Sequence, residues 1–206
     1  MLFGIFIYDG VEPIDLATFG VLSMARRIAP EIKICMIAPK AGPVRLSNDL
    51  VVMAQFGIDS APVCQVIIVT GGPGWEAQSQ SKATLDYIRQ VHASGKVASV
   101  CTGAMILAAS GVLDKKAATT KRAIIPPELS PLAQLRDMYP DINVREAPIV
   151  DAGSVVTGGG VTLCIDTTLY ILGQLLGEKV ANETARIIEY QRALKANAYG
   201  DEFLAG

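Results

Sequence analysis

The sequence predicts an α/β fold with a mostly parallel central sheet. Short apolar runs alternate with segments of helical periodicity along the chain. A strand, a glycine turn and a helix follow one another three times, at residues 66–74, 97–104 and 155–163. Strands that alternate with helices build right-handed βαβ units, in which the strands run parallel.

The first half of the chain supplies most of the expected sheet. Apolar, β-branched runs indicate strands at residues 2–8, 32–38, 66–69 and 97–100. Between them we expect a small hairpin at residues 44–54 and helices at residues 13–28, 81–93 and 101–110, the last of which ends at Gly111.

The second half is expected to complete the sheet and cover it. The pattern indicates a short strand at residues 117–119, a helix near 128–138 that contains Pro131, and a strand at 154–160. An apolar helix at 162–176 and an amphipathic helix at 178–198 follow. We see no linker or low-complexity tract and expect a single domain over residues 1–206.

Composition excludes several classes of protein. Half of the residues (50%) are hydrophobic and 18% are charged, which is enough apolar material for a large core. A net charge of −2 without a basic run disfavours nucleic acid and acidic membranes as partners. No run reaches the roughly 18 apolar residues of a membrane span, and the N-terminus lacks a signal-peptide pattern, so we expect a cytoplasmic protein.

The four cysteines do not form a metal-binding or disulfide pattern. They are widely spaced, with neither a CxxC motif nor a nearby pair of histidines. We therefore expect no metal site and treat each cysteine first as a small buried side chain.

The carboxyl edge of the expected sheet brings candidate functional residues together. Ligands of open parallel sheets bind outside the carboxyl ends of the strands. Asp15 comes just after the first strand, and Cys101 comes directly after the strand at 97–100. The three glycine turns lie at the same edge. We expect these features to form one crevice.

Cys101 lies where a strand turns into a helix. Thr102, Gly103 and Ala104 are small enough for a tight turn. Unpaired N–H groups and the positive end of the helix dipole favour a thiolate, which is the nucleophilic form. The arrangement is similar to a nucleophile elbow, although the GxSxG motif is absent. The local pattern leaves open whether Cys101 is a nucleophile or a buried cysteine at a crowded turn.

Asp15 also has two interpretations. It could be a first-turn carboxylate that offsets the helix dipole, or it could act on Cys101, which requires it to lie within hydrogen-bond reach of the thiol. An ionised Asp15 would raise the thiol pKa, so a useful Asp15 would be protonated and would serve as general acid. Glu12 is the weaker candidate for this role. His92, the sole histidine, lies late in a polar helix and is not expected to pair with Cys101.

The TGGPG turn at residues 70–74 could offer backbone N–H groups to an anion. The stretch from Gly72 to Ala77 also fits GxGxxA. It lies in a later βα unit and lacks the acidic residue expected about 20 positions further on, so we expect no dinucleotide site.

Several longer stretches resemble the ThiJ/PfpI superfamily, and within it the isonitrile hydratase (cyclohexyl-isocyanide hydratase) branch. The carrying segments include VEPIDLATFGVL at 11–22, VIIVTGGPG at 66–74, SVCTGAMILAASGVL at 99–113 and VVTGGGVTLCIDTTLYIL at 155–172. The resemblance implies a flavodoxin-like three-layer sandwich with a nucleophile elbow. It also implies a homodimer that takes a small-molecule substrate.

The resemblance assigns roles to residues at this edge. Cys101 would be the nucleophile, Asp15 the general acid/base, and Thr102 would place polar groups beside the sulfur. Gly72 and the turn from Gly159 to Val161 would line the substrate pocket. The implied reaction adds the thiolate to the terminal carbon of R–N≡C, and Asp15 protonates that carbon. Water then converts the thioimidate to an N-substituted formamide without metal or organic cofactor.

Other activities remain open from the sequence. A stand-alone ligand- or redox-sensing module would use the same Cys101 as an oxidisable thiol. A protease or glutaminase normally needs a histidine near the thiol, and a glyoxalase-type activity a histidine or glutamate pair, so we favour neither.

One segment departs from the family pattern. Relatives commonly read ATTHW where this chain has Ala118, Thr119, Thr120, Lys121 and Arg122. The loss of the histidine and tryptophan alters a pocket wall or a dimer contact. We expect Lys121 and Arg122 to form a solvated basic pair.

Overall fold

The computed structural model describes residues 1–197 and the backbone of residues 204 and 205. In this part of the chain no helix is long and apolar enough to cross a membrane. The same residues contain no cluster of three or more histidine, cysteine or acidic side chains that could hold a metal ion.

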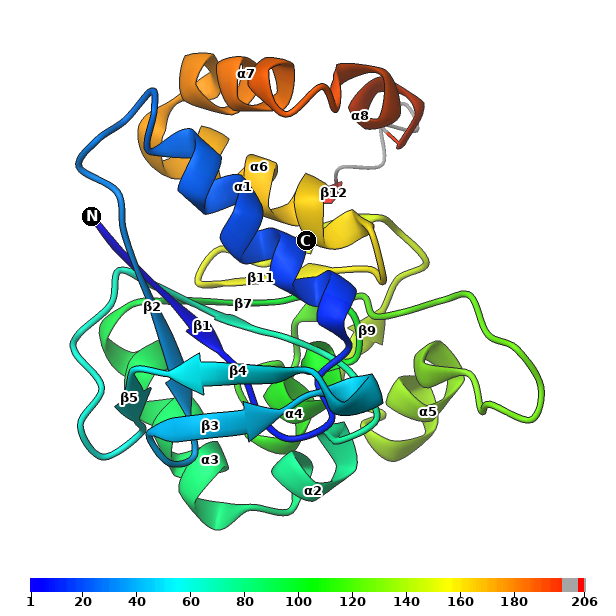
Figure 1. The fold of residues 1–206 in the computed structure, drawn as a ribbon. Helices are drawn as coiled ribbons and strands as arrows, with labels where there is room; N and C mark the ends of the chain where they lie inside the picture. The colour runs from blue at the N-terminus through cyan, green and yellow to red at the C-terminus, as the bar shows by residue number, and fades with distance from the viewer. Residues whose placement is uncertain (198–203, 206) are drawn as a thin grey trace.

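A mixed sheet of eight strands forms the middle layer (Figure 1). All neighbouring pairs are parallel except β10 and β11. The strands, in spatial order, are β12 (Leu204–Ala205), β10 (Ile149–Asp151), β11 (Val155–Gly158), β7 (Lys96–Ser99), β6 (Val66–Val69), β1 (Leu2–Phe6), β2 (Lys33–Ala38) and β5 (Phe56–Gly57).

Helices cover both faces of this sheet, as expected for a three-layer sandwich (Figure 1). One layer contains α1 (Ala17–Ala25), α6 (Leu163–Leu176) and α7 (Glu178–Ile187). The other contains α2 (Trp75–Ser79), α3 (Lys82–Ser94) and α4 (Gly103–Ala109). The α/β fold class predicted from the sequence is therefore confirmed.

Short elements complete the described fold. The expected hairpin pairs β3 (Gly42–Arg45) with β4 (Val51–Ala54) around the 3-10 turn η2 (Ser47–Asp49). The pair β8 (Ala117–Ala118) and β9 (Asn143–Val144) forms a small parallel sheet beside α5 (Pro131–Met138), and α8 (Gln191–Asn197) follows α7.

Three expected helices have different bounds. The segment at 13–28 begins as the 3-10 turn η1 (Pro13–Leu16), and its α-helical part ends at Ala25. The segment at 178–198 is two helices, because Glu189 adopts a left-handed conformation with φ 57°. Residue 198 lies outside the described residues. Pro131 starts α5 instead of lying inside it, and the Ser130 side chain caps that helix.

Other differences concern short elements with little periodicity. Helix α2 and the antiparallel strand β10 were not anticipated, since five and three residues are too few for a periodic signal. Strands β5 and β9, each of two residues, were missed for the same reason.

The close contact between α4 and β6 depends on a glycine. A Cβ on Gly103 would lie 2.9 Å from the Thr70 carbonyl oxygen and closer still to that of Val69. Both of these atoms belong to backbone and cannot rotate away. Gly103 therefore lets α4 begin directly against the end of β6.

We expect Gly103→Ala to destabilise the protein by about 1–3 kcal/mol, because the added methyl overpacks a fixed backbone contact. Gly20→Ala is the matched control, since Gly20 also lies in a helix but has no atom within 4 Å of the place that a methyl group would take. Alanine there should stabilise α1 by roughly 0.5–1 kcal/mol. Urea unfolding of both variants tests the comparison, and equal free energies of unfolding would contradict it.

Candidate active site

Cys101 occupies a sharp turn between β7 and α4. Its φ of 52° is left-handed, a conformation that a non-glycine side chain adopts at a cost of about 1–2 kcal/mol. Two hydrogen bonds hold this backbone: the Cys101 amide donates to the Gly159 carbonyl (3.1 Å), and the Thr120 hydroxyl donates to the Cys101 carbonyl (2.9 Å). The strand–turn–helix geometry is that of a nucleophile elbow.

The glycine turn after β6 packs directly against this elbow. A Cβ on Gly71 would lie 2.8 Å from the Cys101 Cβ, so a side chain is excluded there. The Gly71 amide donates to Asp15 Oδ2 (2.7 Å), and the Gly72 amide donates to Thr102 Oγ1 (2.8 Å). Both amides thus bind side chains of the site itself. The expectation that the Gly72 amide is free to bind an anion is wrong for this structure.

Asp15 is a fully buried carboxyl group within η1. Gly71 satisfies Oδ2, but Oδ1 has no hydrogen-bond partner. Burial raises the pKa of Asp15 to about 7, and the charge of Glu12 adds to this, while the Gly71 hydrogen bond opposes it. At neutral pH, Asp15 therefore exists in both protonation states.

The Cys101 thiol is 3% exposed, and its pKa lies above the usual value of 9. Burial is the largest cause and the charge of Asp15 the second. The Thr102 amide and hydroxyl and the charge of Lys121 favour the thiolate but do not compensate. The N–H groups of the helix N-terminus favour the thiolate, as expected, but burial and the Asp15 charge outweigh them and favour the thiol.

The expected hydrogen bond between Asp15 and Cys101 is absent, and the two groups influence each other through charge. Among the described residues, neither Asp15 oxygen forms one with the sulfur, and Oδ1 remains unpartnered. With the carboxyl pKa near 7 and the thiol pKa above 9, the pair holds one proton between these values, and that proton resides mainly on sulfur.

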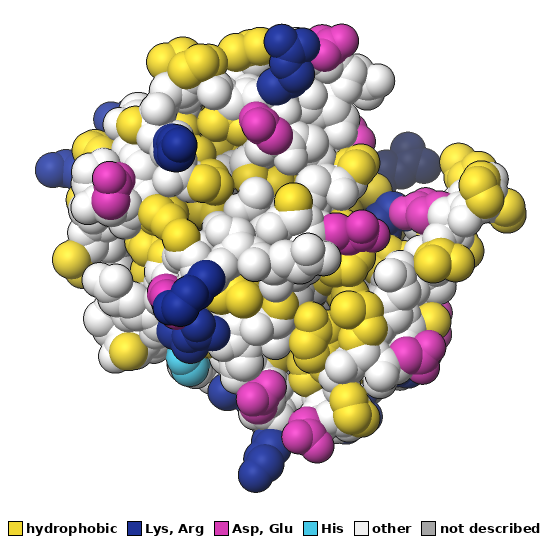
Figure 2. Space-filling view, turned by 90° about the horizontal axis from the view of Figure 1, so that it is seen from below, with side chains coloured by type: hydrophobic (Ala, Val, Ile, Leu, Met, Phe, Trp, Pro, Cys, Tyr) yellow, Lys and Arg dark blue, Asp and Glu magenta, His cyan; other side chains and the backbone are white. Residues whose placement is uncertain are grey.

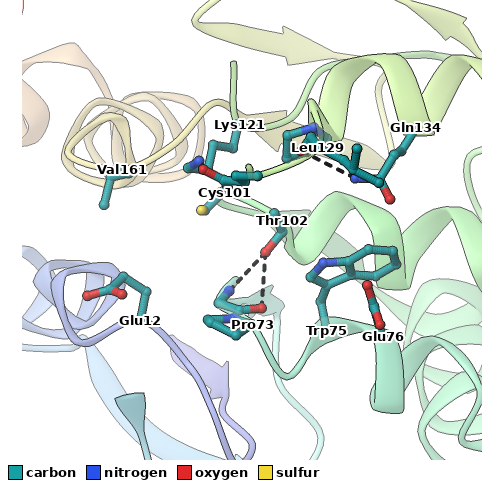
Figure 3. Close-up of a pocket in the computed structure, with 13 residues that line it drawn as sticks. Glu12, Pro73, Trp75, Glu76, Cys101, Thr102, Lys121, Leu129, Gln134 and Val161 are labelled. Carbon is teal, nitrogen blue, oxygen red and sulfur yellow. Dashed lines mark hydrogen bonds and ion pairs between the residues drawn. The ribbon is translucent and has the colours of Figure 1, made fainter. Parts of the chain in front are cut away.

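A cavity of about 610 Å³ opens onto this pair. Figure 3 shows the sulfur of Cys101 facing the space between Val161 and Glu12. The Thr102 hydroxyl lies over the turn at Gly72 and Pro73, to which it is hydrogen-bonded (Figure 3). The remaining lining residues are Trp75, Glu76, Lys121, Glu128, Leu129, Pro131 and Gln134.

The residues selected from the sequence divide into two groups. Cys101, Thr102, Gly72 and Val161 line the cavity. Asp15 lies behind it, and Gly159 fixes the Cys101 backbone without lining the cavity. The expectation that Gly159 would line the pocket is therefore not met.

Lys121 has a different environment from the one expected. Its side chain is only 17% exposed, lines the cavity and forms an ion pair with Glu128. The expected solvated basic pair is thus wrong for Lys121. The ion pair joins the start of the loop of residues 121–130 to a point near its end, and this loop projects at the right of Figure 1.

The same loop exposes hydrophobic side chains. Figure 2 shows them at this edge of the molecule, where Ile125 is 80% and Leu129 70% exposed.

Several cavity residues were missed because they come from segments without a motif. Glu128, Leu129 and Gln134 belong to the loop and helix after β8, where local patterns say nothing about the cavity. Trp75 is the only tryptophan of the chain and follows the glycine turn, which was the one available signal. His92 does not line the cavity; its ring contacts the Ser154 hydroxyl at 2.9 Å.

Comparisons with known proteins agree with this geometry. Residues 4–174 match the model of the DJ-1/PfpI family. The chain is 30% identical to isonitrile hydratase of Pseudomonas putida over 92% of this chain and 78% of that protein. It is 29% identical to protein DJ-1alpha of Drosophila melanogaster over 70% of this chain and 64% of that protein.

A solved structure of a protein from this family has the same fold. The crystal structure of a ThiJ/PfpI family protein from Pseudomonas syringae superposes with a TM-score of 0.79 at 23% identity, covering 92% of this chain and 75% of that one. Together with the matched residues 4–174, these similarities show that the chain belongs to the DJ-1/PfpI family.

Proposed function

We propose that this protein hydrates an isonitrile, R–N≡C, to an N-substituted formamide. The observation that carries the proposal is the buried Asp15 carboxyl, whose Oδ1 has no partner and whose charge acts on the Cys101 thiol. No histidine lines the cavity onto which Cys101 opens. The 30% identity to isonitrile hydratase supports the same reaction.

The acid–base arrangement favours this reaction over peptide or amide cleavage. Cysteine hydrolases normally activate the thiol with a histidine, and none lines this cavity. A carboxyl group with a pKa near 7 can both accept and donate a proton at neutral pH. Adding both sulfur and hydrogen to one substrate carbon needs such a group.

In the first step, Asp15 Oδ1 accepts the thiol proton as the Cys101 sulfur attacks the terminal carbon. The carboxyl group then delivers this proton to the same carbon. One S–C and one C–H bond form, and the product is a thioimidate, R–N=CH–S, attached to Cys101. Asp15 is left ionised and ready to act as a base.

In the second step, the ionised Asp15 accepts a proton from water as the water oxygen adds to the thioimidate carbon. The C–S bond then breaks and releases R–NH–CHO. One proton of the water ends on nitrogen and the other returns to the Cys101 sulfur. The enzyme regains its starting protonation state, and no electrons are gained or lost.

The shape of the substrate suits the position of Asp15. Asp15 does not line the cavity, so the reacting carbon must come close to the Cys101 sulfur for Asp15 to exchange a proton with it. The terminal carbon of an isonitrile carries no substituent and sits at the end of a linear group. The substituent R would remain in the 610 Å³ cavity, against apolar surface from Trp75, Leu129 and Pro131.

A second candidate function uses the same thiol. The polar groups around Cys101 favour a redox-sensing role, in which Thr102 and protonated Asp15 would stabilise an oxidised sulfur. This role needs no organic substrate and therefore predicts no formamide in the assay below.

We expect the purified protein to convert an aryl isonitrile to the corresponding formamide. Cys101→Ala should reduce the rate to background, and Asp15→Asn should lower kcat by roughly 10²–10⁴-fold through loss of the acid–base group. Cys64→Ser is a matched control that removes a thiol outside the cavity and should retain activity. Chromatography of the product measures formamide. Absence of formamide from the wild type, or full activity of Cys101→Ala, would refute the proposal.

The pH dependence follows from the one-proton state of the pair. Below pH about 7 both groups are protonated and no base is present, so kcat/KM should fall about tenfold per pH unit there. Above pH 7 it should reach a plateau that extends past pH 9, because the thiol pKa is raised. Initial rates between pH 5 and 9.5 test this profile. A maximum below pH 6 would contradict the assignment.

A further inference from the structure

Two further cysteines lie close to each other and away from Cys101. Cys35 in β2 and Cys64 just before β6 are both buried, with their sulfur atoms 3.8 Å apart. Cys35 is paired with Gly4, in the middle of β1. The turn at Cys101 lies beyond the carboxyl ends of the strands, where Phe6, Val69 and Ser99 are the last paired residues. The thiol pair therefore belongs to a separate part of the core.

The absence of a side chain at Gly4 leaves room for the Cys64 sulfur. Strand β1 lies between β2 and β6, so the two thiols approach each other across β1. A Cβ on Gly4 would lie 3.0 Å from the Cys64 sulfur, 2.8 Å from Ile37 Cδ1 and closer still to Ile67 Cδ1. The Cys64 sulfur therefore shares the space over this glycine with two isoleucine side chains.

A buried phenol without a hydrogen-bond partner lies in the same part of the core. Tyr87 of α3 packs its ring 6.2 Å from that of Phe6, two residues after Gly4 on the same strand. Its hydroxyl is buried and has no hydrogen-bond partner. Burial raises the pKa of Tyr87, and the charges of Cys64 and Cys35 act in the same direction. An oxygen atom added to either sulfur could accept the unused phenol hydrogen bond.

We propose that Cys35 and Cys64 form a redox-active dithiol that hydrogen peroxide oxidises to a disulfide, independently of Cys101. The proposal stands on the 3.8 Å sulfur separation, the space left by Gly4 and the unpartnered Tyr87 hydroxyl. It does not depend on the hydratase reaction.

The first oxidation occurs at Cys35. Either sulfur can donate in the contact between Cys35 and Cys64, and the Cys64 thiol also reaches the Pro62 carbonyl oxygen at 3.4 Å. We place the first oxidation at Cys35 because donation from Cys64 lowers the pKa of Cys35 and raises that of Cys64. The Cys35 thiolate attacks one oxygen of the peroxide, the O–O bond breaks, and hydroxide leaves with the electron pair. Cys35 becomes a sulfenic acid, and Tyr87 donates a hydrogen bond to its oxygen.

The second step closes the disulfide. The Cys64 sulfur attacks the Cys35 sulfur, the S–O bond breaks, and the departing oxygen takes the Cys64 proton. Overall, two thiols and one peroxide give one disulfide and two waters. The sulfur atoms must move from 3.8 Å to about 2.05 Å. Residues 61–65 lie outside helices and strands, and Val63 is 81% exposed, so this segment can supply the movement.

The test uses the full chain carrying Cys101→Ala, which removes oxidation at the elbow. After mild hydrogen peroxide, free thiols are alkylated in denaturant and the protein is digested with trypsin. The cysteines fall in four different tryptic peptides, with Cys35 in 34–40 and Cys64 in 46–82. We expect these two peptides to be joined in more than nine-tenths of the molecules, two hydrogens lighter than the sum, and separated again by dithiothreitol.

Single variants decide the mechanism. In Cys64→Ser the oxidation should stop at Cys35 sulfenic acid, which dimedone traps, and in Cys35→Ser neither the disulfide nor the trapped acid should form. Tyr87→Phe should slow disulfide formation about tenfold, while Tyr139→Phe, a tyrosine outside this cluster, should not.

The proposal would be overturned if the peptides 34–40 and 46–82 stayed separate after peroxide and Cys64→Ser gave no dimedone adduct. A formamide assay of the same samples keeps this result separate from the proposed hydratase activity.

Discussion

The burial of one carboxyl group determines the chemistry available at this site. Asp15 has no exposure to solvent, and its single hydrogen bond comes from the Gly71 amide at 2.7 Å. A shift of its pKa from 3.8 to about 7 corresponds to roughly 4 kcal/mol of stability that the fold gives up as the pH rises from about 4 to 7. An acid–base role explains why the fold keeps a buried carboxyl group whose Oδ1 has no hydrogen-bond partner, despite this loss of stability.

The backbone around Asp15 holds this arrangement in place. Gly71 brings the turn after β6 within contact distance of Cys101, and the Gly159 carbonyl and Thr120 hydroxyl stabilise the strained Cys101 backbone. Three segments distant in sequence thus meet at one sulfur. The Gly72 amide donates its hydrogen bond to the Thr102 hydroxyl. The turn therefore orients side chains of the site and does not bind the reacting group itself.

Much of the fold could be predicted from the sequence, because parallel strands that are buried on both faces leave long apolar runs. The elbow at Cys101 and the nearness of Asp15 followed from the rule that strand ends meet at one edge. The raised pKa of the Cys101 thiol could not be predicted. It results from burial and the Asp15 charge, and a sequence does not show how deeply a side chain is buried. Lys121 was misjudged because its partner Glu128 lies seven positions further along a loop without periodicity.

The mechanism requires that Asp15 lose its proton near pH 7 while Cys101 keeps its own, so that the pair holds one proton between pH 7 and 9. Infrared difference spectra of the wild type against Asp15→Asn and Cys101→Ala measure both groups directly. We expect the carboxylic acid band of Asp15 to disappear as the pH rises through about 7, while the S–H band of Cys101 persists past pH 9. A carboxylate already ionised at pH 5, or a Cys101 thiolate at pH 7, would contradict it.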